Sequence, residues 1–438
     1  MKKEYRILVL FIIILLLFTS IFVYKFFNTD NPSFLTSKSV SIDKGDNSKK
    51  ITLVFSYGGS DHKEIFKRNA ELFHEANPNI EVKLQQLSTT TDYQRSTYKS
   101  ALPLEGNNID VFYSDTIWTS EFASLGLTLP LDKYFTKNIQ KDFTLNSIAA
   151  CVYKDSIYAV PGHIDAPFLY YRKDIIPTPP KTYEELIADI TTYKNSPRIK
   201  YGYIYQGYSY EGLVCNALEF IWSNGAGFGD KNTPIINMPA AVKGIEKFIA
   251  LARPELNSPD MLTFQEDDSL LAFQDGTALF MRNWPYAYTQ LNSDNSKVKG
   301  IFDIAPLPLT SDGSQSLVTL GGWNFSISKN SKNPDIAWKF IQWMTSLDSQ
   351  LKACLAGSVP TRKALYDNPE FLKQVPWISN YKSVFETAKL RPVTPYYSLI
   401  SEDMQINFKN AITNKITATK ALENIAQNLK YISEIPEP

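Results

Sequence analysis

The chain has 438 residues, 44% of them hydrophobic, and its 45 Lys and Arg residues balance 45 Asp and Glu residues. Zero net charge without a cationic cluster argues against nucleic acid as a partner. The three cysteines, Cys151, Cys215 and Cys354, are odd in number and far apart. They therefore indicate neither a disulfide framework nor a metal site, and no cofactor is expected.

The N-terminal segment predicts export. Lys2, Lys3 and Arg6 precede Ile7 to Tyr24, an uncharged run of eighteen residues. This run is near the lower limit for a membrane-spanning helix, and the preceding positive charges would stay in the cytoplasm. A signal peptide is the alternative, but its apolar region is usually shorter and ends in a small-residue cleavage site. We expect residues 1–27 to be an uncleaved anchor, with the remaining chain on the extracellular face of the cell membrane.

Residues 28–50 are polar and poor in large apolar side chains, as in a flexible linker. The roughly 390 residues that follow exceed the length at which a single hydrophobic core usually stops growing. This part of the chain therefore predicts two lobes.

Hydrophobic periodicity predicts the α/β class. Ile51 to Phe55 is typical of a strand, the next segment places apolar residues on one helical face, and Pro78 should end that helix. Alternation then returns from Ile80 to Leu84, as in a second strand. Such a β-α-β opening favours a mainly parallel sheet covered by helices. A later helix should begin with Pro334 in its first turn.

Signatures of catalysis are weak. The histidines are His62, His74 and His163, and the first two are too far apart along one helix to share a metal. Residues 207–212 (Gly-Tyr-Ser-Tyr-Glu-Gly) miss the pattern of a nucleophile elbow by one glycine. The acidic run 266–268 fits the start of a helix, where carboxylates cap and complement the dipole. The chain is therefore predicted not to be an enzyme.

Two tryptophan motifs indicate a carbohydrate site. They are Arg282-Asn283-Trp284-Pro285 and Gly321-Gly322-Trp323-Asn324. An indole can stack on the C–H face of a sugar, and a neighbouring glycine lets backbone approach a ligand closely. Burial of both rings in the core is the competing interpretation.

Several segments, in order along the chain, resemble the extracellular solute-binding proteins of carbohydrate ABC transporters. They are Asp110-Val111-Phe112-Tyr113-Ser114-Asp115, Tyr158-Ala159-Val160-Pro161, Leu169-Tyr170-Tyr171-Arg172-Lys173-Asp174, Phe273-Gln274-Asp275-Gly276-Thr277-Ala278, Asn283-Trp284-Pro285, Gly322-Trp323 and Ser328-Lys329-Asn330. The C-terminal segments most resemble the trehalose/maltose-binding branch; they are Val359-Pro360-Thr361-Arg362 and Arg391-Pro392-Val393-Thr394-Pro395-Tyr396-Tyr397. The chain departs from the family's Gram-positive members in lacking an N-terminal cysteine for lipid attachment.

This resemblance implies a periplasmic-binding-protein-like fold of type II, with two α/β lobes joined by crossover strands. The expected N-terminal lobe is 50–164 plus 284–325, and the expected C-terminal lobe is 165–283 plus 326–438. It also implies a monomer that captures a di- or oligosaccharide, such as trehalose or maltose, and delivers it to ABC permease subunits.

The resemblance and the chemistry of sugar binding together give a set of candidate ligand-binding residues. Asp115, Asp165 and Arg391 would hold hydroxyls, while Trp284, Trp323 and Tyr397 would supply surface. Gly322 and Glu64 complete the set. Structural alternatives are a helix cap for Asp115, a turn for Asp165 and a surface ion pair for Arg391.

Two other functions fit the sequence. A membrane-tethered glycoside hydrolase would need two carboxylates flanking the scissile bond, which Asp115 and Asp165 could supply. A sugar sensor would present bound ligand to a signalling receptor. The sequence leaves the identity of the sugar open.

Overall fold

The structure is a computed structural model that describes residues 50–59, 62–228, 234–236, 239–310 and 316–436. The predicted anchor, and the predicted linker apart from Lys50, lie outside the described residues. Within the described ranges, every helix is too short or too polar to cross a membrane.

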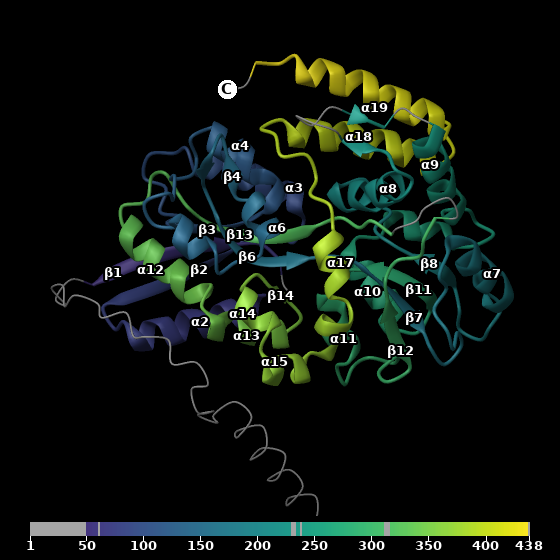
Figure 1. Cartoon of the computed structure of the whole chain (residues 1–438), viewed down its shortest axis with the longest axis horizontal. Coiled ribbons are helices and arrows are strands. Elements are labelled where there is room, and N and C mark those ends of the chain that lie inside the picture. Colours follow the sequence, from purple (N-terminus) through teal and green to yellow (C-terminus); the bar gives the residue numbers. More distant parts are fainter. Residues whose placement is uncertain (1–49, 60–61, 229–233, 237–238, 311–315, 437–438) are drawn as a thin grey trace, which may run out of the picture. The chain divides into compact units, whose positions relative to one another are not determined.

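The first sheet has six strands in the order β14-β6-β13-β3-β1-β2 (Figure 1). Their bounds are Val359–Pro360 (β14), Val160–Asp165 (β6), Gly321–Ile327 (β13), Val111–Asp115 (β3), Ile51–Tyr57 (β1) and Ile80–Gln86 (β2). β1 pairs in parallel with β2 and β3, as the β-α-β opening predicts. β13 is antiparallel to both β3 and β6, so the sheet is mixed. The difference arises because β6 and β13 adjoin segments that run to the other sheet, and are not successive β-α-β units.

Helices pack against this sheet where the apolar periodicity places them. The helices are α2 (Lys63–Ala76), α3 (Thr91–Ala101), α4 (Thr119–Ser124), α12 (Pro334–Met344) and α13 (Leu347–Leu355), with the short 3₁₀ helix η1 (Thr116–Trp118). α2 buries Phe66 and Phe73, and α12 buries Phe340 next to Phe55 of β1, where the ring centroids are 5.5 Å apart. Pro334 occupies the first turn of α12, as predicted.

The second sheet has four strands in the order β12-β7-β11-β8 (Figure 1). They are Phe302–Ala305 (β12), Phe168–Arg172 (β7), Ala278–Asn283 (β11) and Tyr201–Ile204 (β8). The longer helices of this half are α7 (Tyr183–Tyr193), α8 (Glu211–Ser223), α9 (Pro239–Leu251), α10 (Glu266–Gln274), α18 (Tyr397–Ile412) and α19 (Ala418–Ser433). α8 is buried along nearly its whole length, with α9 and α18 packed against it. The prediction of two α/β lobes is therefore confirmed.

Several segments, β14 among them, lie differently from the expected lobe boundaries, and β12 and α12 show the reason. β12, within 284–325, pairs with β7 and so belongs to the second sheet. α12, within 326–438, packs its apolar face on the core of the first sheet. The physical reason is the same for both: each buries its apolar residues on the sheet that its neighbours already form.

Short elements complete the described fold. They are α5 (Lys137–Gln140), α6 (Leu145–Ala149), β4 (Val152–Tyr153), β5 (Ser156–Ile157), β9 (Gly227–Phe228), β10 (Pro234–Ile235), η3 (Pro259–Thr263), α11 (Tyr286–Leu291), α14 (Lys363–Tyr366), α15 (Pro369–Gln374), α16 (Pro376–Asn380) and α17 (Lys382–Thr387). The segment from α14 to α17 precedes Arg391, and its apolar residues join the core of the second sheet.

Candidate functional site

A cavity of about 350 Å³ is lined by residues from both sheets and their helices. Such a volume lies within the range typical of small-molecule sites, about 300–1,000 Å³. Six of the eight candidate residues line it: Asp115, Asp165, Trp284, Gly322, Trp323 and Arg391. The sequence motifs that carry them are more than 200 residues apart at the extremes, and the fold brings them to one place.

The first sheet supplies an aromatic wall. Trp323 on β13 is half-buried and stacks on Tyr113 of β3, with ring centroids 5.8 Å apart and planes 23° apart. The buried Trp118 ring meets Trp323 edge to face at 5.5 Å. Trp323 is thus fixed by neighbouring rings while part of its surface remains in the cavity wall.

The second sheet supplies the other tryptophan. Trp284 follows β11 directly, and its ring centroid is 4.1 Å from the guanidinium carbon of Arg282. Its indole N–H donates to Glu266 Oε1 at 3.3 Å. Because Arg282 is fully buried, the indole face beneath it is closed to a ligand, and the rest of the half-buried ring lines the cavity.

A buried ion pair holds Arg282 in place. Its Nη2 donates to Glu219 Oε1 at 2.5 Å and its Nη1 to Gln206 Oε1 at 3.0 Å. Burial raises the pKa of Glu219, an effect that the adjacent guanidinium opposes. Removing one member of such a pair would leave an uncompensated buried charge. The pair fixes the Arg282 guanidinium and with it the surface on which the Trp284 ring rests.

Asp165 ends β6 and belongs to a chain of polar side chains. Its Oδ2 lies 3.0 Å from His163 Nε2, and His163 Nδ1 lies 2.6 Å from the hydroxyl oxygen of Tyr113. Residues two apart on a strand share a face, which puts His163 and Asp165 side by side. The ring of His62 stacks on His163 with centroids 4.6 Å apart. The proposed turn role for Asp165 is not what the structure shows, since Asp165 lies in a strand.

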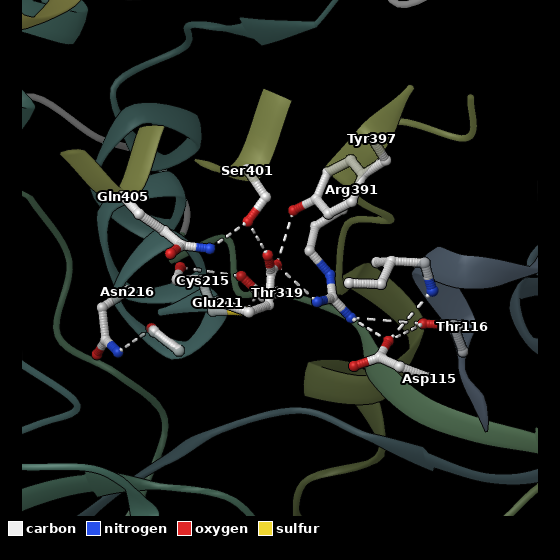
Figure 2. Close-up of polar contacts among 12 residues, drawn as sticks. Asp115, Thr116, Glu211, Cys215, Asn216, Thr319, Arg391, Tyr397, Ser401 and Gln405 are labelled. Atoms are coloured by element: carbon white, nitrogen blue, oxygen red, sulfur yellow. Dashed lines mark hydrogen bonds and ion pairs between the residues drawn. The ribbon is translucent and has the colours of Figure 1, made fainter. Parts of the chain in front are cut away.

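Arg391 joins carboxylates from the two halves of the described fold (Figure 2). Its Nη2 donates to Asp115 Oδ1 at 3.2 Å, and its Nη1 donates to Glu211 Oε1 at 2.8 Å. Its side chain is only 3% exposed, which excludes a surface ion pair. Asp115 Oδ1 also accepts from the backbone N–H of Ile117, so the predicted capping role and a place in the cavity wall hold together.

Two candidate residues lie outside the cavity wall. Tyr397, 1% exposed, donates its hydroxyl hydrogen to Glu211 Oε1 at 2.7 Å. Burial and the Glu211 carboxylate raise its pKa well above the ordinary value, so the phenol stays protonated. Ser401 donates to the other oxygen of Glu211, so both side chains hold the Glu211 carboxylate, as Figure 2 shows. Glu64 is exposed on the first turn of α2 and is not among the lining residues.

The two glycines before Trp323 have packing roles. Gly322 has φ +133, and a Cβ there would lie 2.4 Å from the carbonyl oxygen of His163. A Cβ on Gly321 would lie 3.2 Å from the Trp284 ring and from Asp165 Cβ. The sequence predicts that glycine here lets the backbone approach a ligand. The structure adds that the two glycines let β13 approach β6 and Trp284.

Many lining residues are outside the candidate set, and four of them make contacts that shape the site: Tyr113, His163, Glu211 and Glu266. Glu211 lies in residues 207–212, the segment that misses the pattern of a nucleophile elbow by one glycine. The spacing of His163 and Asp165 on one strand was a usable signal. The capping prediction for 266–268 is confirmed by the capping box of Gln265 and Asp268, while Glu266 turns to Tyr210 and Trp284. Burial raises the pKa of Glu266.

The arrangement suits a neutral polyhydroxylated ligand. Two indoles from different sheets offer apolar surface, and carboxylates between them accept hydrogen bonds from hydroxyls. The described residues contain no cluster of three or more His, Cys, Asp or Glu side chains suited to a metal ion. These features define a two-lobed binding protein.

Comparison with known proteins identifies the family. Residues 59–351 match the bacterial extracellular solute-binding proteins, and the chain belongs to this family. A probable ABC transporter-binding protein of Deinococcus radiodurans is 30% identical over 80% of this chain and 86% of its own length. A maltotriose-binding protein of Pyrococcus abyssi is 27% identical over 76% of this chain and 71% of its own length.

A solved structure supports the same assignment. The maltose-bound MalE3 of T. maritima superposes with a TM-score of 0.83 at 32% identity, covering 87% of this chain and all of that one. The expected membership of the carbohydrate-binding solute-binding proteins is confirmed. The relatives are binding proteins and not enzymes, consistent with the weak catalytic signatures.

Proposed function

We propose that this protein is the extracellular receptor of an ABC importer for a di- or oligosaccharide, an α-glucoside such as maltose or trehalose. The observation that carries the proposal is the pairing of Trp284 and Trp323 from different sheets across one cavity with Asp165. Closure of the two lobes on the sugar would bring both indoles onto its rings and would present a closed receptor to the permease subunits.

The choice of an α-glucoside rests on the relatives. The T. maritima structure contains maltose, and the P. abyssi relative is a maltotriose-binding protein. Each pyranose ring offers one C–H face to an indole and several hydroxyls to carboxylates. A ligand of two or more rings can therefore contact both tryptophans at once.

A thermal-shift screen of residues 50–438 tests the proposal directly. The panel is maltose, trehalose, sucrose and maltotriose, with Trp284→Ala as the matched control. A sugar that raises the melting temperature of the wild type, and not of the variant, supports the proposal. No shift with any of the four sugars counts against it. Release of glucose during incubation would instead support the alternative of a glycoside hydrolase.

We further propose that residues 7–24 hold the receptor at the outer face of the membrane. The support is the uncharged run with Lys2, Lys3 and Arg6 before it. Intact-mass measurement of protein from the membrane fraction tests it. A mature N-terminus near residue 28 would show that the segment is removed.

A further inference from the structure

We propose that His163 is the positioning residue of the sugar site: its Nε2–H fixes one oxygen of Asp165 and leaves the other to accept a ligand hydroxyl. This inference rests on the proposed sugar-binding function. It concerns a side chain that lines the cavity together with Asp165 and Trp323.

The first argument is the geometry of the pair. His163 Nε2 lies 3.0 Å from Asp165 Oδ2, and the two side chains are 5% and 16% exposed. A carboxylate can only accept, so the proton of this hydrogen bond belongs to Nε2. Asp165 Oδ1 has no donor among the described residues, and Asp165 lines the cavity. One oxygen is therefore held and the other is available.

The second argument is that the imidazole itself cannot turn. Its Nδ1 is 2.6 Å from the Tyr113 hydroxyl, and its ring lies 4.6 Å from the His62 ring with planes 17° apart. His62 is tied in turn to Ser358, with Nε2 2.7 Å from the hydroxyl oxygen. Strands β3 and β6 and the start of α2 thus fix the plane from which Nε2–H points at Asp165.

The consequence is preorganisation. A free aspartate would have to give up rotamer freedom when a sugar hydroxyl binds, and that loss weakens affinity. Asp165 is already held by His163, with its Cβ close to the Gly321 backbone, so the ligand meets an acceptor in place. Loss of the Nε2–H donor should lower affinity without removing Asp165 itself.

Two amide substitutions test the roles of the two imidazole nitrogens of His163 separately. In His163→Gln the amide N–H occupies the Nε2 position and can still donate to Asp165. In His163→Asn the amide lies near Nδ1 and reaches only Tyr113. We expect His163→Asn to weaken maltose binding about tenfold and His163→Gln to stay within about threefold of the wild type, by calorimetric titration. His74→Asn is the matched control, because His74 on α2 bonds the Ile80 carbonyl through Nδ1, and this variant should bind as the wild type does.

A double-mutant cycle with Asp165→Asn tests whether His163 acts through Asp165. If it does, His163→Asn should cost little further affinity in the Asp165→Asn background. An equal loss in both backgrounds, or a folded His163→Asn protein with wild-type affinity, overturns the proposal. Unfolding curves for each variant show whether a loss of binding is a loss of fold.

A spectroscopic measurement needs no sugar. The chain has only three histidines, so their imidazole ¹⁵N–¹H correlations can be assigned by single substitution. We expect His163 to carry a proton on Nε2 and its signal to move in Asp165→Asn. A bare Nε2 overturns the inference even if maltose binds. A protonated Nε2 that responds to Asp165→Asn, in a protein that binds none of the sugars, would leave this hydrogen bond standing and reject the proposed function.

Discussion

At the residue scale, the site is built from side chains that are held before any ligand arrives. Trp284 rests on the buried Arg282 guanidinium and donates to Glu266, and Trp323 is packed between Tyr113 and Trp118. Arg391 is fixed between Asp115 and Glu211. Groups held in this way lose little freedom on binding, which favours affinity from a small number of contacts.

Replacement of Trp284 by Ala should weaken maltose binding while leaving the protein folded. The change removes a large apolar contact from the cavity, for which about 2 kcal/mol or more is typical, or roughly thirtyfold in dissociation constant. Calorimetric titration measures the loss. Trp338→Ala is the control, since this half-buried ring stacks on Tyr134 of the first half with centroids 5.7 Å apart and does not line the cavity. It should lower stability and keep affinity; a Trp284→Ala protein that behaves in this way would show that Trp284 is a packing residue.

Sequence reasoning located the tryptophans, the two aspartates and Arg391 because they sit in local motifs. It missed His163 and Glu211, whose roles depend on partners that are distant in the chain. The carboxylate of Glu211 receives hydrogen bonds from Arg391, 180 residues away, and from Tyr397, 186 residues away. The same limit explains Tyr397. Its motif makes it a candidate ligand-binding residue, but the sequence does not show that its hydroxyl points to Glu211.

At the scale of the elements, the two glycines of β13 let this strand lie close to β6 and to the Trp284 ring. Gly322 combines a positive φ with a carbonyl oxygen 2.4 Å from the position of a Cβ. Gly322→Ala should therefore lower the free energy of unfolding by about 3 kcal/mol, the sum of backbone strain and overpacking. Gly126→Ala separates the two causes, because Gly126 has φ +66 and open space around it; about 1 kcal/mol is expected there. Equal losses in the two variants, from denaturant titration, would exclude a steric role.

The first turn of α3 faces the carboxylates of the site. Burial, with a further contribution from Glu211, raises the pKa of Asp92 from 3.8 to about 6. A raised pKa means that the folded state binds the proton more tightly, so this contribution to stability is present below about pH 4 and is lost as the pH rises through 6. Asp92→Asn should flatten the unfolding free energy between these values, by on the order of 2 kcal/mol. Parallel profiles for variant and wild type would contradict the assignment.

Periodicity predicted α2, β2 and α12 because each buries one regular face, and the apolar run predicted β1, which is buried on both faces from Leu53 to Tyr57. The mixed direction of the first sheet was not predictable in this way. β13 is antiparallel to β3 and to β6, a pairing set by where the chain returns from the other sheet and not by any local pattern. The same limit explains the displaced lobe boundaries, since β12 carries no sequence sign of which sheet it will join.

At the scale of the whole described fold, few segments connect the two sheets. β6 leads into β7 through Ala166 and Pro167, and β12 leads back to β13. The third connection follows β14, because β14 pairs with β6 in the first sheet and the segment from α14 to α17 joins the core of the second. Arg391 adds a side-chain bridge, since it contacts Asp115 on the first half and Glu211 on the second. Short connections of this kind allow hinge motion, in which a few residues between rigid halves absorb the change in dihedral angles.

A sugar that contacts both halves should favour the closed arrangement. Trp323 and Asp115 belong to the first half, and Trp284 and Glu266 belong to the second, so a ligand touching all four is bound more tightly when the halves approach. Small-angle scattering of residues 50–438 should show a smaller radius of gyration with saturating maltose than without it. Trp284→Ala at the same maltose concentration should scatter as the free protein does. Superimposable curves for the wild type, at a concentration where calorimetry shows full occupancy, would mean that this receptor binds sugar without closing.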